Sequence, residues 1–336
     1  MTGTIDFRVY KGSASGAIVE AHGHRTLGPT EAIVDITHCG VCGTDEHYRQ
    51  GDMGLGHEWV GIIKELGNNA GRISDLKVGD RVGMGWMQKV CLHCESCLSG
   101  EHVRCLNSIQ FGDGNWDEGG FGTGGCWDVG SLYRIPDEIK SEHAGPLMCG
   151  GATVFGPLYE HGMLPGSRVG VVGIGGLGHL AIQYGQKMGY EMVVFSGTES
   201  KKAEALSFGA AEFHATKDVK QFEGVEPIDH LLITTSFLPD FELFAPVLKK
   251  FAKIFPLTIT PEPLAVPMLG LVVGGWNIIG SAGARTNSLR KMLDFTAKHG
   301  IKPQIELFPM TQQGVTDAMQ KLKEGKMRYR GVVTVQ

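Results

Sequence analysis

Four cysteines stand close together in the sequence at a spacing typical of a metal site. Cys91, Cys94, Cys97 and Cys105 form the pattern C-x2-C-x2-C-x7-C. Four thiolates surround one Zn²⁺ tetrahedrally and leave no position for a substrate, which is the arrangement of a structural zinc site. An iron–sulfur cluster also uses four cysteines, but its bacterial pattern has a shorter last spacing followed by proline. We therefore predict a structural zinc rather than a cluster or four unrelated thiols.

A second set of metal-binding residue types is dispersed along the chain. Cys42 lies in C-G-V-C-G-T-D-E-H, His57 and Glu58 lie in G-H-E, and Cys149 lies in P-L-M-C-G-G-A-T. Two thiolates and one imidazole with an open fourth position make a catalytic zinc arrangement, and Glu58 is able to take that position when substrate is absent. Each motif by itself is equally typical of a surface histidine or a buried cysteine. The prediction of a catalytic zinc therefore depends on the order of the motifs and on the family pattern described below.

A glycine turn in the middle of the chain has the pattern of a dinucleotide-binding site. The segment G-I-G-G-L-G follows an apolar strand pattern at Val169–Val172 and opens a helical pattern. Glycines in this position let the backbone approach a pyrophosphate, which binds at the N-terminus of the helix. The residues predicted to contact the cofactor here are Gly173, Gly175, Gly176, Leu177 and Gly178.

The end of the next strand distinguishes between the two nicotinamide cofactors. An NAD site places Asp or Glu there, against the ribose 2′-hydroxyl. This chain instead has S-G-T-E-S-K-K after Phe195, so that no acid stands at the strand tip. The hydroxyls of Ser196 and Thr198 and the ammonium of Lys201 suit a 2′-phosphate, and we predict NADP(H). The alternative is that the two lysines form a solvated helix face and that Glu199 repels a phosphate.

The expected elements around these motifs fall into two kinds. The first 148 residues are β-rich, with apolar runs separated by turn residues at 17–19, 32–36, 60–63 and 81–83. From about 150 to 285, strands expected at 169–173, 192–195, 230–234 and 254–256 alternate with helices expected at 178–188, 201–208 and 246–251. Such alternation indicates βαβ units and a parallel sheet. A helix at 288–299 and a strand at 329–335 are expected to complete the chain.

Composition limits the class of protein. The chain has 336 residues, a net charge of −5 and 50 glycines, which indicates about two domains with many tight turns. The acidic balance argues against a nucleic-acid or anionic membrane surface. No apolar stretch is long enough to span a bilayer and the start has no signal-peptide pattern, so that a cytoplasmic protein is expected. In such a chain, eight cysteines favour metal binding over disulfides.

Taken together, these motifs resemble the zinc-dependent medium-chain alcohol dehydrogenases, and most closely their cinnamyl-alcohol-dehydrogenase-like, NADP-preferring branch. The resemblance runs nearly from end to end, and includes P-L-M-C-G-G-A-T-V-F and the closing R-Y-R-G-V-V. It implies an α/β architecture: a discontinuous GroES-like β-rich catalytic domain at 1–149 and 287–336, and a Rossmann domain with a doubly wound parallel sheet at 150–286. It also implies a homodimer, with 276–280 as an edge strand at the two-fold axis.

The resemblance assigns roles to individual residues. It makes Cys42 the zinc ligand, with Cys39 and Cys126 as packed neighbours. Thr44 and His47 become a proton relay that passes through the cofactor ribose, and His47 is otherwise read as a polar surface histidine. Asp45 becomes the partner that orients His57. Weaker expectations place Thr153 beside the nicotinamide and Arg330 beside the pyrophosphate, while Met53, Leu55, Trp59 and Trp86 are guesses for the substrate pocket.

The expected function is that of an NADP(H)-dependent alcohol dehydrogenase or aldehyde reductase, acting on CH–OH groups with two Zn²⁺ per chain and a small aldehyde or alcohol as substrate. Two departures from the family pattern bear on the substrate. Only 14 residues separate Cys42 from His57, and Gly124-Gly125-Cys126-Trp127 stands where relatives often have G-G-Y-S. An alternative is therefore an imine or enal (C=C) reductase on the same fold. A remote alternative is a cofactor-binding protein without catalysis.

Overall fold

The computed structural model describes residues 3–114 and 116–335. Their contacts divide the chain into two compact units. Unit 1 consists of Met1–Cys149 with Arg285–Gln336, and unit 2 of Gly150–Ala284. The sequence had placed the second crossover at 286/287, two residues later. Because unit 1 contains the segments on both sides of unit 2, unit 2 is an insertion within it.

Unit 1 is built on a mixed sheet with the strand order β16-β17-β3-β4-β5-β9, with β8 also pairing with β3. The strands are β3 (Glu31–Val41), β4 (Trp59–Leu66), β5 (Arg81–Met84), β8 (Gly124–Asp128), β9 (Tyr133–Arg134), β16 (Ile305–Pro309) and β17 (Arg330–Thr334). Two hairpins, β1 (Thr4–Lys11) with β2 (Val19–Thr26) and β6 (Met87–Lys89) with β7 (Ile109–Gln110), flank it. The core of unit 1 is apolar. It includes the rings of Trp59 and Trp127, whose centroids lie 4.4 Å apart.

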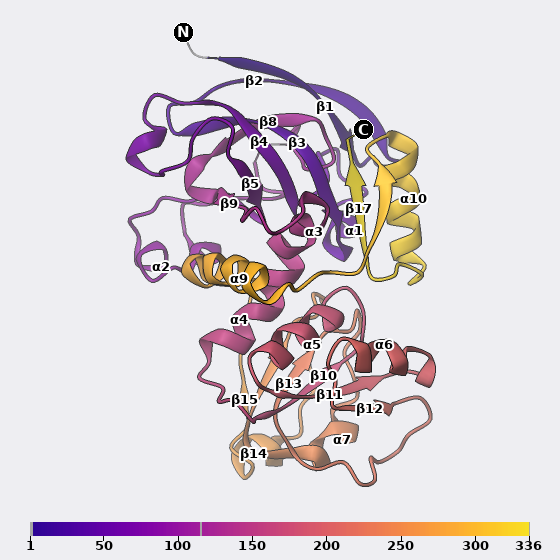
Figure 1. Ribbon diagram of the computed structural model, residues 1–336. Helices are drawn as coiled ribbons and strands as arrows, with labels where there is room; N and C mark the ends of the chain where they lie inside the picture. The colour runs from indigo at the N-terminus through magenta and orange to yellow at the C-terminus, as the bar shows by residue number, and fades with distance from the viewer. Residues whose placement is uncertain (1–2, 115, 336) are drawn as a thin grey trace. The chain divides into compact units, whose positions relative to one another are not determined.

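The helices of unit 1 are short, except for the two near the C-terminus. They are α1 (Gly43–His47), α2 (Glu95–Leu98), α3 (Ser141–Pro146), α9 (Thr286–His299) and α10 (Gln312–Lys323), with 3-10 turns η1 (Ala70–Arg72), η2 (His102–Arg104) and η3 (Val129–Ser131). The side chain of Thr311 caps α10 by accepting a hydrogen bond from the backbone of Gly314. Figure 1 shows α10 lying along β16 and β17, where Val315, Ala318 and Met319 are buried. This packing fixes the C-terminal segment to the sheet.

Unit 2 contains a parallel sheet with the strand order β12-β11-β10-β13-β14-β15. Its strands are β10 (Arg168–Val172), β11 (Glu191–Ser196), β12 (Glu212–Ala215), β13 (Ile228–Ile233), β14 (Leu248–Pro256) and β15 (Asn277–Ile278). Its helical segments are α4 (Ala152–Glu160), α5 (Gly178–Lys187), η5 (Glu199–Lys201), α6 (Lys202–Ser207), α7 (Phe241–Phe244), η6 (Ala245–Val247) and α8 (Met268–Val272). A π-helical turn, η4 (Leu147–Gly151), joins the two units. The central strands are buried almost throughout, as expected for a parallel sheet covered on both faces. The structure thus contains the two predicted kinds of domain, one β-rich with a mixed sheet and one with a parallel sheet and helices.

Two of the expected elements are wrong in type or place. The helix expected at 246–251 is instead the 3-10 turn η6 followed by the first residues of β14. A short apolar run does not distinguish helix from strand, and here pairing with β13 decides the outcome. Phe251, within β14, has a φ of 64° and donates its N–H to the carbonyl of Gly274. The strand expected at 17–19 begins only at Val19 and extends to Thr26.

Among the described residues, no helix is both long and apolar enough to cross a membrane. Glu118 is one of several carboxyl groups buried in unit 1. Glu118 is 1% exposed; its Oε2 lies 3.1 Å from Nε of Arg25, and its Oε1 accepts a 2.7 Å hydrogen bond from the backbone of Cys126. Burial raises the pKa of Glu118 to about 7, although Arg25 and the Cys126 amide oppose this.

The buried Glu118 should make stability depend on pH in a defined window. The folded-state pKa of Glu118 lies above the ordinary value of 4.5, so that the folded protein holds the proton more tightly than the unfolded chain. The contribution of Glu118 to the free energy of unfolding is therefore most favourable below 4.5 and falls as the pH rises to about 7. Urea unfolding of wild type and Glu118→Gln across this range should show their difference decreasing with pH. The exposed Glu138→Gln serves as control, and a constant difference for Glu118→Gln would contradict the burial argument.

Candidate metal centres and nucleotide-binding turn

The dispersed metal-binding residues come together in unit 1. Cys42 follows β3, His57 and Glu58 precede β4, and Cys149 lies in the π-helical turn η4. One ligand atom from each of the four lies within 4.8 Å of all the others. His57 and Glu58 are fully buried, and Oε2 of Glu58 has no hydrogen-bond partner. Two thiols, an imidazole and an unpartnered carboxylate oxygen fit a tetrahedral zinc site.

Asp45 holds the imidazole and the neighbouring backbone in place. Its Oδ1 lies 2.8 Å from Nδ1 of His57 and accepts a 3.1 Å bond from the N–H of Gly56, while Oδ2 accepts a 3.0 Å bond from the N–H of Cys42. With Nδ1 turned toward Asp45, Nε2 of His57 is directed to the thiol of Cys149 at 3.3 Å. The carboxylate of Asp45 thus orients the ring and raises its basicity, as the carboxylate partner of a metal-bound histidine does.

The acid–base properties of the group reflect this crowding. A hydrogen bond from Cys149 lowers the pKa of Cys42 well below its usual value, and the same contact raises the pKa of Cys149. Burial would lower the pKa of His57, but Asp45 raises it well above its usual value. The thiol pair thus keeps one proton that a divalent cation has to displace.

Glu58 has a second buried partner, which the sequence did not indicate. Arg330, from β17, is 4% exposed, and its Nη2 forms an ion pair with Oε1 of Glu58. Burial raises the pKa of Glu58 to about 8 although the guanidinium opposes this. In the structure the Arg330 side chain pairs with Glu58. Its contact with a pyrophosphate stays a prediction.

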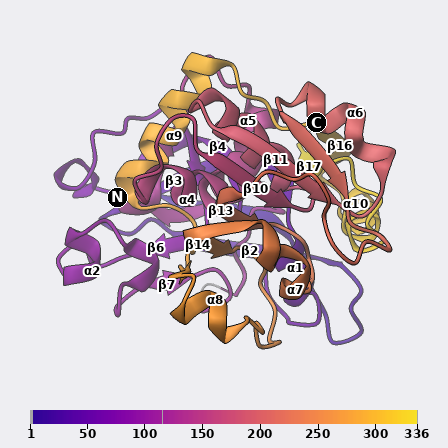
Figure 2. The same ribbon diagram turned by 90° about the horizontal axis from the view of Figure 1, so that it is seen from below.

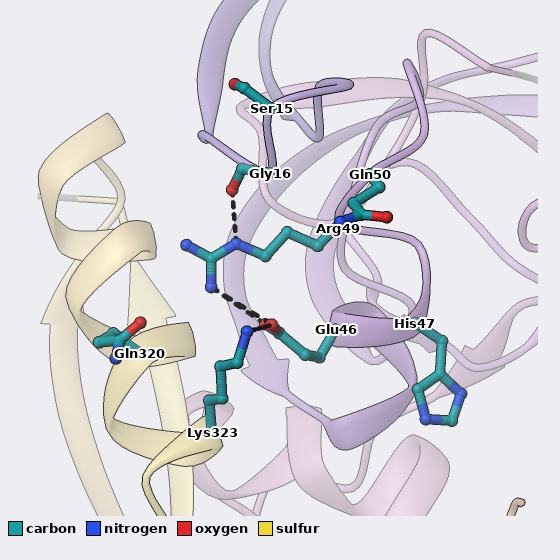
Figure 3. Close-up of a pocket in the computed structure, with 8 residues that line it drawn as sticks. All are labelled: Ser15, Gly16, Glu46, His47, Arg49, Gln50, Gln320 and Lys323. Atoms are coloured by element: carbon teal, nitrogen blue, oxygen red, sulfur yellow. Dashed lines mark hydrogen bonds and ion pairs between the residues drawn. The ribbon is translucent and has the colours of Figure 1, made fainter.

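Thr44 and His47 lie on the short helix α1. The thiol of Cys42 lies 3.8 Å from Oγ1 of Thr44, which places the threonine hydroxyl beside the metal-binding group. His47 follows one helical turn later and is exposed. Its imidazole lines a polar cavity of about 450 Å³ (Figure 3). The order of the two side chains, one next to the metal-binding group and one at the surface, suits the transfer of a proton.

The four clustered cysteines also form one group, with all four sulfurs within 4.8 Å of one another. Cys91 and Cys97 are 3.9 Å apart, and backbone N–H groups of Cys94 and Cys91 point at the sulfurs of Cys91 and Cys105. N–H donors around thiol sulfur favour the thiolate form that a metal requires. Figure 2 shows α2, which ends just after Cys97, beside the β6–β7 hairpin. The donor set and its closed shell fit a structural zinc.

The glycine turn in unit 2 has the backbone geometry of an anion-binding turn. Gly173 follows β10 with a φ of 93°, which favours glycine, and a Cβ on Gly178 would lie 2.0 Å from the carbonyl oxygen of Gly173. By contrast, a Cβ on Gly175 would meet nothing within 4 Å, so that this side of the turn is open. α5 begins at Gly178, after Gly176 and the N-cap Leu177. The turn therefore leaves room for a phosphate at the helix N-terminus.

The residues expected at a 2′-phosphate lie at the carboxyl end of β11. Ser196 ends that strand, the hydroxyls of Thr198 and Ser200 lie 2.9 Å apart, and Nζ of Lys201 donates to the carbonyl of Ile174 in the glycine turn. Glu199, which in the alternative prediction repels a phosphate, forms a 3.3 Å ion pair with Lys202. Thr153, expected at the nicotinamide, lies in α4 of the same unit.

Comparison with known proteins agrees with this geometry. Residues 28–137 match the family model described as alcohol dehydrogenase GroES-like domain, and residues 176–298 match that of zinc-binding dehydrogenase. A probable formaldehyde dehydrogenase of Bacillus subtilis is 33% identical over 93% of this chain and 92% of its own length. This chain belongs to the zinc-dependent medium-chain alcohol dehydrogenases. The family expected from the motifs, including its cinnamyl-alcohol-dehydrogenase-like branch, is thereby confirmed.

Other relatives of this alcohol dehydrogenase have similar coverage. The NADP-dependent alcohol dehydrogenase C 1 of Mycolicibacterium smegmatis is 31% identical, with 92% of this chain and 91% of the relative covered. A cinnamyl alcohol dehydrogenase of Sorghum bicolor superposes with a TM-score of 0.89 at 28% identity, over 99% and 98% of the chains. CAD of Helicobacter pylori, solved with NADP(H), gives 0.87 at 26% identity over 99% of both.

The aromatic surroundings of His57 differ from the sequence-based guesses. Trp59 and Leu55 are fully buried in the core of unit 1, and Met53 is 2% exposed, while their predicted place at the substrate pocket stays a prediction. Trp86 does approach His57, with ring centroids 5.6 Å apart, and Phe111, which the sequence analysis missed, lies at 5.1 Å. No local pattern marks Phe111, because it reaches the site from the end of the β6–β7 hairpin.

The two metal centres should respond differently to loss of one thiol. Cys105→Ser opens the closed four-cysteine shell, and we expect the melting temperature to fall by about 5–10 °C. Cys149→Ser removes a ligand from the other group, which is supported by Asp45 and by the surrounding sheet, so that melting should change little. Zinc analysis with thermal unfolding of both variants tests this. Each variant should lose one of two zincs; a Cys105→Ser protein with normal melting and two zincs would contradict the assignment.

Proposed function

We propose that this enzyme interconverts small aldehydes and alcohols, with NADP(H) as the hydride carrier and Cys42, His57 and Cys149 as ligands of a catalytic zinc. The observation that supports it most is the meeting of these residues with Glu58 in one buried group whose ligand atoms lie within 4.8 Å. Bound Zn²⁺ would polarise the substrate oxygen and bound NADP(H) would supply or accept the hydride. The residues of the chain hold the metal, orient its ligands and supply the proton to the reacting oxygen.

Thr44 and His47 are the residues proposed to transfer the proton. The hydroxyl of Thr44, beside Cys42, is placed to give its proton to the reacting oxygen during aldehyde reduction. His47, exposed one turn further along α1, exchanges that proton with water. Asp45 keeps the His57 ring in one orientation, which keeps the metal-binding group fixed while charge develops.

Glu58 and Arg330 have a supporting role in this proposal. The pair leaves Oε1 of Glu58 occupied and Oε2 without a hydrogen-bond partner. Oε2 is therefore the oxygen able to fill the fourth metal position in the absence of substrate. Because Arg330 keeps its partner in either state, the buried carboxylate is never left as an isolated charge.

The cofactor preference is supported by unit 2. Ser196, Thr198 and Lys201 are proposed to contact the 2′-phosphate, because they follow the end of β11 and Lys201 bonds the glycine turn, and Thr153 is proposed at the nicotinamide. The Mycolicibacterium smegmatis relative is named as NADP-dependent, and the Helicobacter pylori structure holds NADP(H). Both relatives cover nearly the whole chain.

A second candidate is reduction of a conjugated C=C or a C=N bond by the same parts. The observation that favours it is the short segment of 14 residues between Cys42 and His57. A shorter segment here changes the space near the metal-binding group without touching its ligands. Product analysis with a conjugated aldehyde separates the two, because aldehyde reduction gives the unsaturated alcohol and enal reduction gives the saturated aldehyde.

We also propose a homodimer in the cytoplasm. β15 is the edge strand of the unit 2 sheet, and the nearby α8 segment exposes apolar side chains, with Leu269 76% and Val272 74% exposed. A second copy of this chain is the occupant that pairs with an edge and covers such a surface. All eight cysteines are free thiols, as is usual in a reducing compartment.

Loss of the Thr44 hydroxyl tests the proton relay. Thr44→Val keeps the size of the side chain but removes the proton donor, so that aldehyde turnover should fall on the order of a hundredfold or more. Zinc content should stay unchanged and NADPH should still bind, because Thr44 is not proposed as a zinc ligand and its relay contact with the cofactor ribose is a single hydrogen bond. Thr316→Val, a threonine substitution on α10, is the matched control. Unchanged turnover in Thr44→Val would exclude the relay role.

Lys201→Gln tests the basis of the cofactor preference. Lys201 bonds the glycine turn through Ile174 and is proposed to contact the 2′-phosphate. Loss of a phosphate contact should raise the Kd for NADPH about tenfold and leave NADH binding nearly unchanged. Fluorescence titration with both cofactors measures this, with the exposed Lys187→Gln as control. Equal weakening of both cofactors would mean that Lys201 acts only by supporting the turn.

A further inference from the structure

The cavity beside His47 lies entirely within unit 1. Its walls come from three segments, which contribute Ser15 and Gly16 between β1 and β2, Glu46, His47, Arg49 and Gln50 of α1 and the turn after it, and Gln320 with Lys323 on α10. Figure 3 shows the side chains of Arg49 and Lys323 gathered around Glu46, with the His47 imidazole apart from them at the edge of this space. With a volume of about 450 Å³, the cavity is much larger than one water molecule and is bordered mainly by polar groups.

The charged side chains of the cavity form one connected cluster. Nη1 of Arg49 lies 3.2 Å from Oε2 of Glu46, and Nζ of Lys323 lies 3.0 Å from Oε1 of Glu46. Nε of Arg49 donates a 2.6 Å bond to the carbonyl of Gly16. Glu46 is the single acid among the lining residues, against two permanent cations. The walls therefore carry an excess of positive charge.

The geometry of this cluster suits an anion. Glu46 and Gly16 fix the guanidinium of Arg49, whose side chain is only 14% exposed, so that its charge is poorly screened by water. A guanidinium beside an ammonium is the usual recognition pair for phosphate-type oxyanions. Ser15 and Gln50 line the same space and carry uncharged donor groups.

We propose that this cavity binds a small free oxyanion of the phosphate class next to His47, and that the anion exchanges the relay proton with solvent. The inference rests on the relay role proposed for His47. During alcohol oxidation an N–H bond of protonated His47 breaks and an O–H bond forms on the anion, so that HPO₄²⁻ becomes H₂PO₄⁻. No electrons are exchanged, and during aldehyde reduction the proton moves in the opposite direction.

Binding is tested with inorganic phosphate and the zinc-loaded enzyme, by calorimetric titration at constant ionic strength. Wild type should show saturable binding to one site. Lys323→Gln should weaken it several-fold and Arg49→Gln about tenfold or more. Because Arg49 also anchors Gly16, Lys323→Gln is the variant that tests charge without disturbing the loop. Lys326→Gln, an exposed lysine at 69% that does not line the cavity, is the matched control.

Three binding results would overturn the proposal. The first is the absence of saturable phosphate binding to wild type, and the second is equal weakening in Lys323→Gln and Lys326→Gln. The third is competitive displacement of phosphate by NADPH, since the occupant would then be a phosphate of the cofactor and not a free anion. Undiminished phosphate binding at saturating NADPH is the expected result.

The proton-exchange step has its own measurement. Proton release in a single turnover of alcohol oxidation, followed with a pH indicator dye, should accelerate about threefold with phosphate in wild type and much less in Lys323→Gln. A rate independent of phosphate in wild type would overturn the exchange role. Thr44→Val separates this inference from the proposed function: it should lose turnover but keep phosphate binding. Normal turnover in that variant would disprove the relay, whereas lost phosphate binding in Lys326→Gln would disprove the site.

Discussion

The hydrogen bonds of the buried Asp45 carboxylate are the interaction on which the proposed catalytic centre depends. Through two oxygens it holds the backbone of Cys42, the backbone of Gly56 and the ring of His57. These groups belong to segments on either side of α1 and its following turn, which have no regular pairing of their own. A carboxylate in the interior is stable only when such partners satisfy it. The same bonds that stabilise Asp45 therefore determine where two metal ligands lie.

The two metal centres are assembled in opposite ways. The four-cysteine group comes from one stretch of 15 residues, from Cys91 to Cys105, and needs only a short helix and tight turns to close. The other group requires Cys149 to approach His57, 92 residues away in the sequence, and it is completed by Arg330, 272 residues from Glu58. The first depends on local chain geometry, while the second depends on the whole sheet of unit 1.

This difference explains what could be predicted from the sequence. The cysteine cluster and the glycine turn were recognised from spacing, because their chemistry lies in consecutive residues. Cys42, His57 and Cys149 were selected only through resemblance to a family, since each motif alone is common. The pairing of Arg330 with Glu58 and the approach of Phe111 to His57 had no local signal, because tertiary packing creates them. The helix expected at 246–251 failed for the same reason: pairing with β13 outweighs local preference.

The position of β17 has a consequence for how the protein is made. β17 pairs with β3, with Val41 opposite Gly331, and it carries the Arg330 that neutralises Glu58. A nascent chain emerging from the ribosome has released all of its zinc ligands long before this strand appears. The inserted unit 2, Gly150–Ala284, is complete earlier and can fold first. The centre of unit 1 thus acquires this buried charge only after the whole of unit 2 has been synthesised, so that the proposed catalytic site cannot be complete before β17 has emerged.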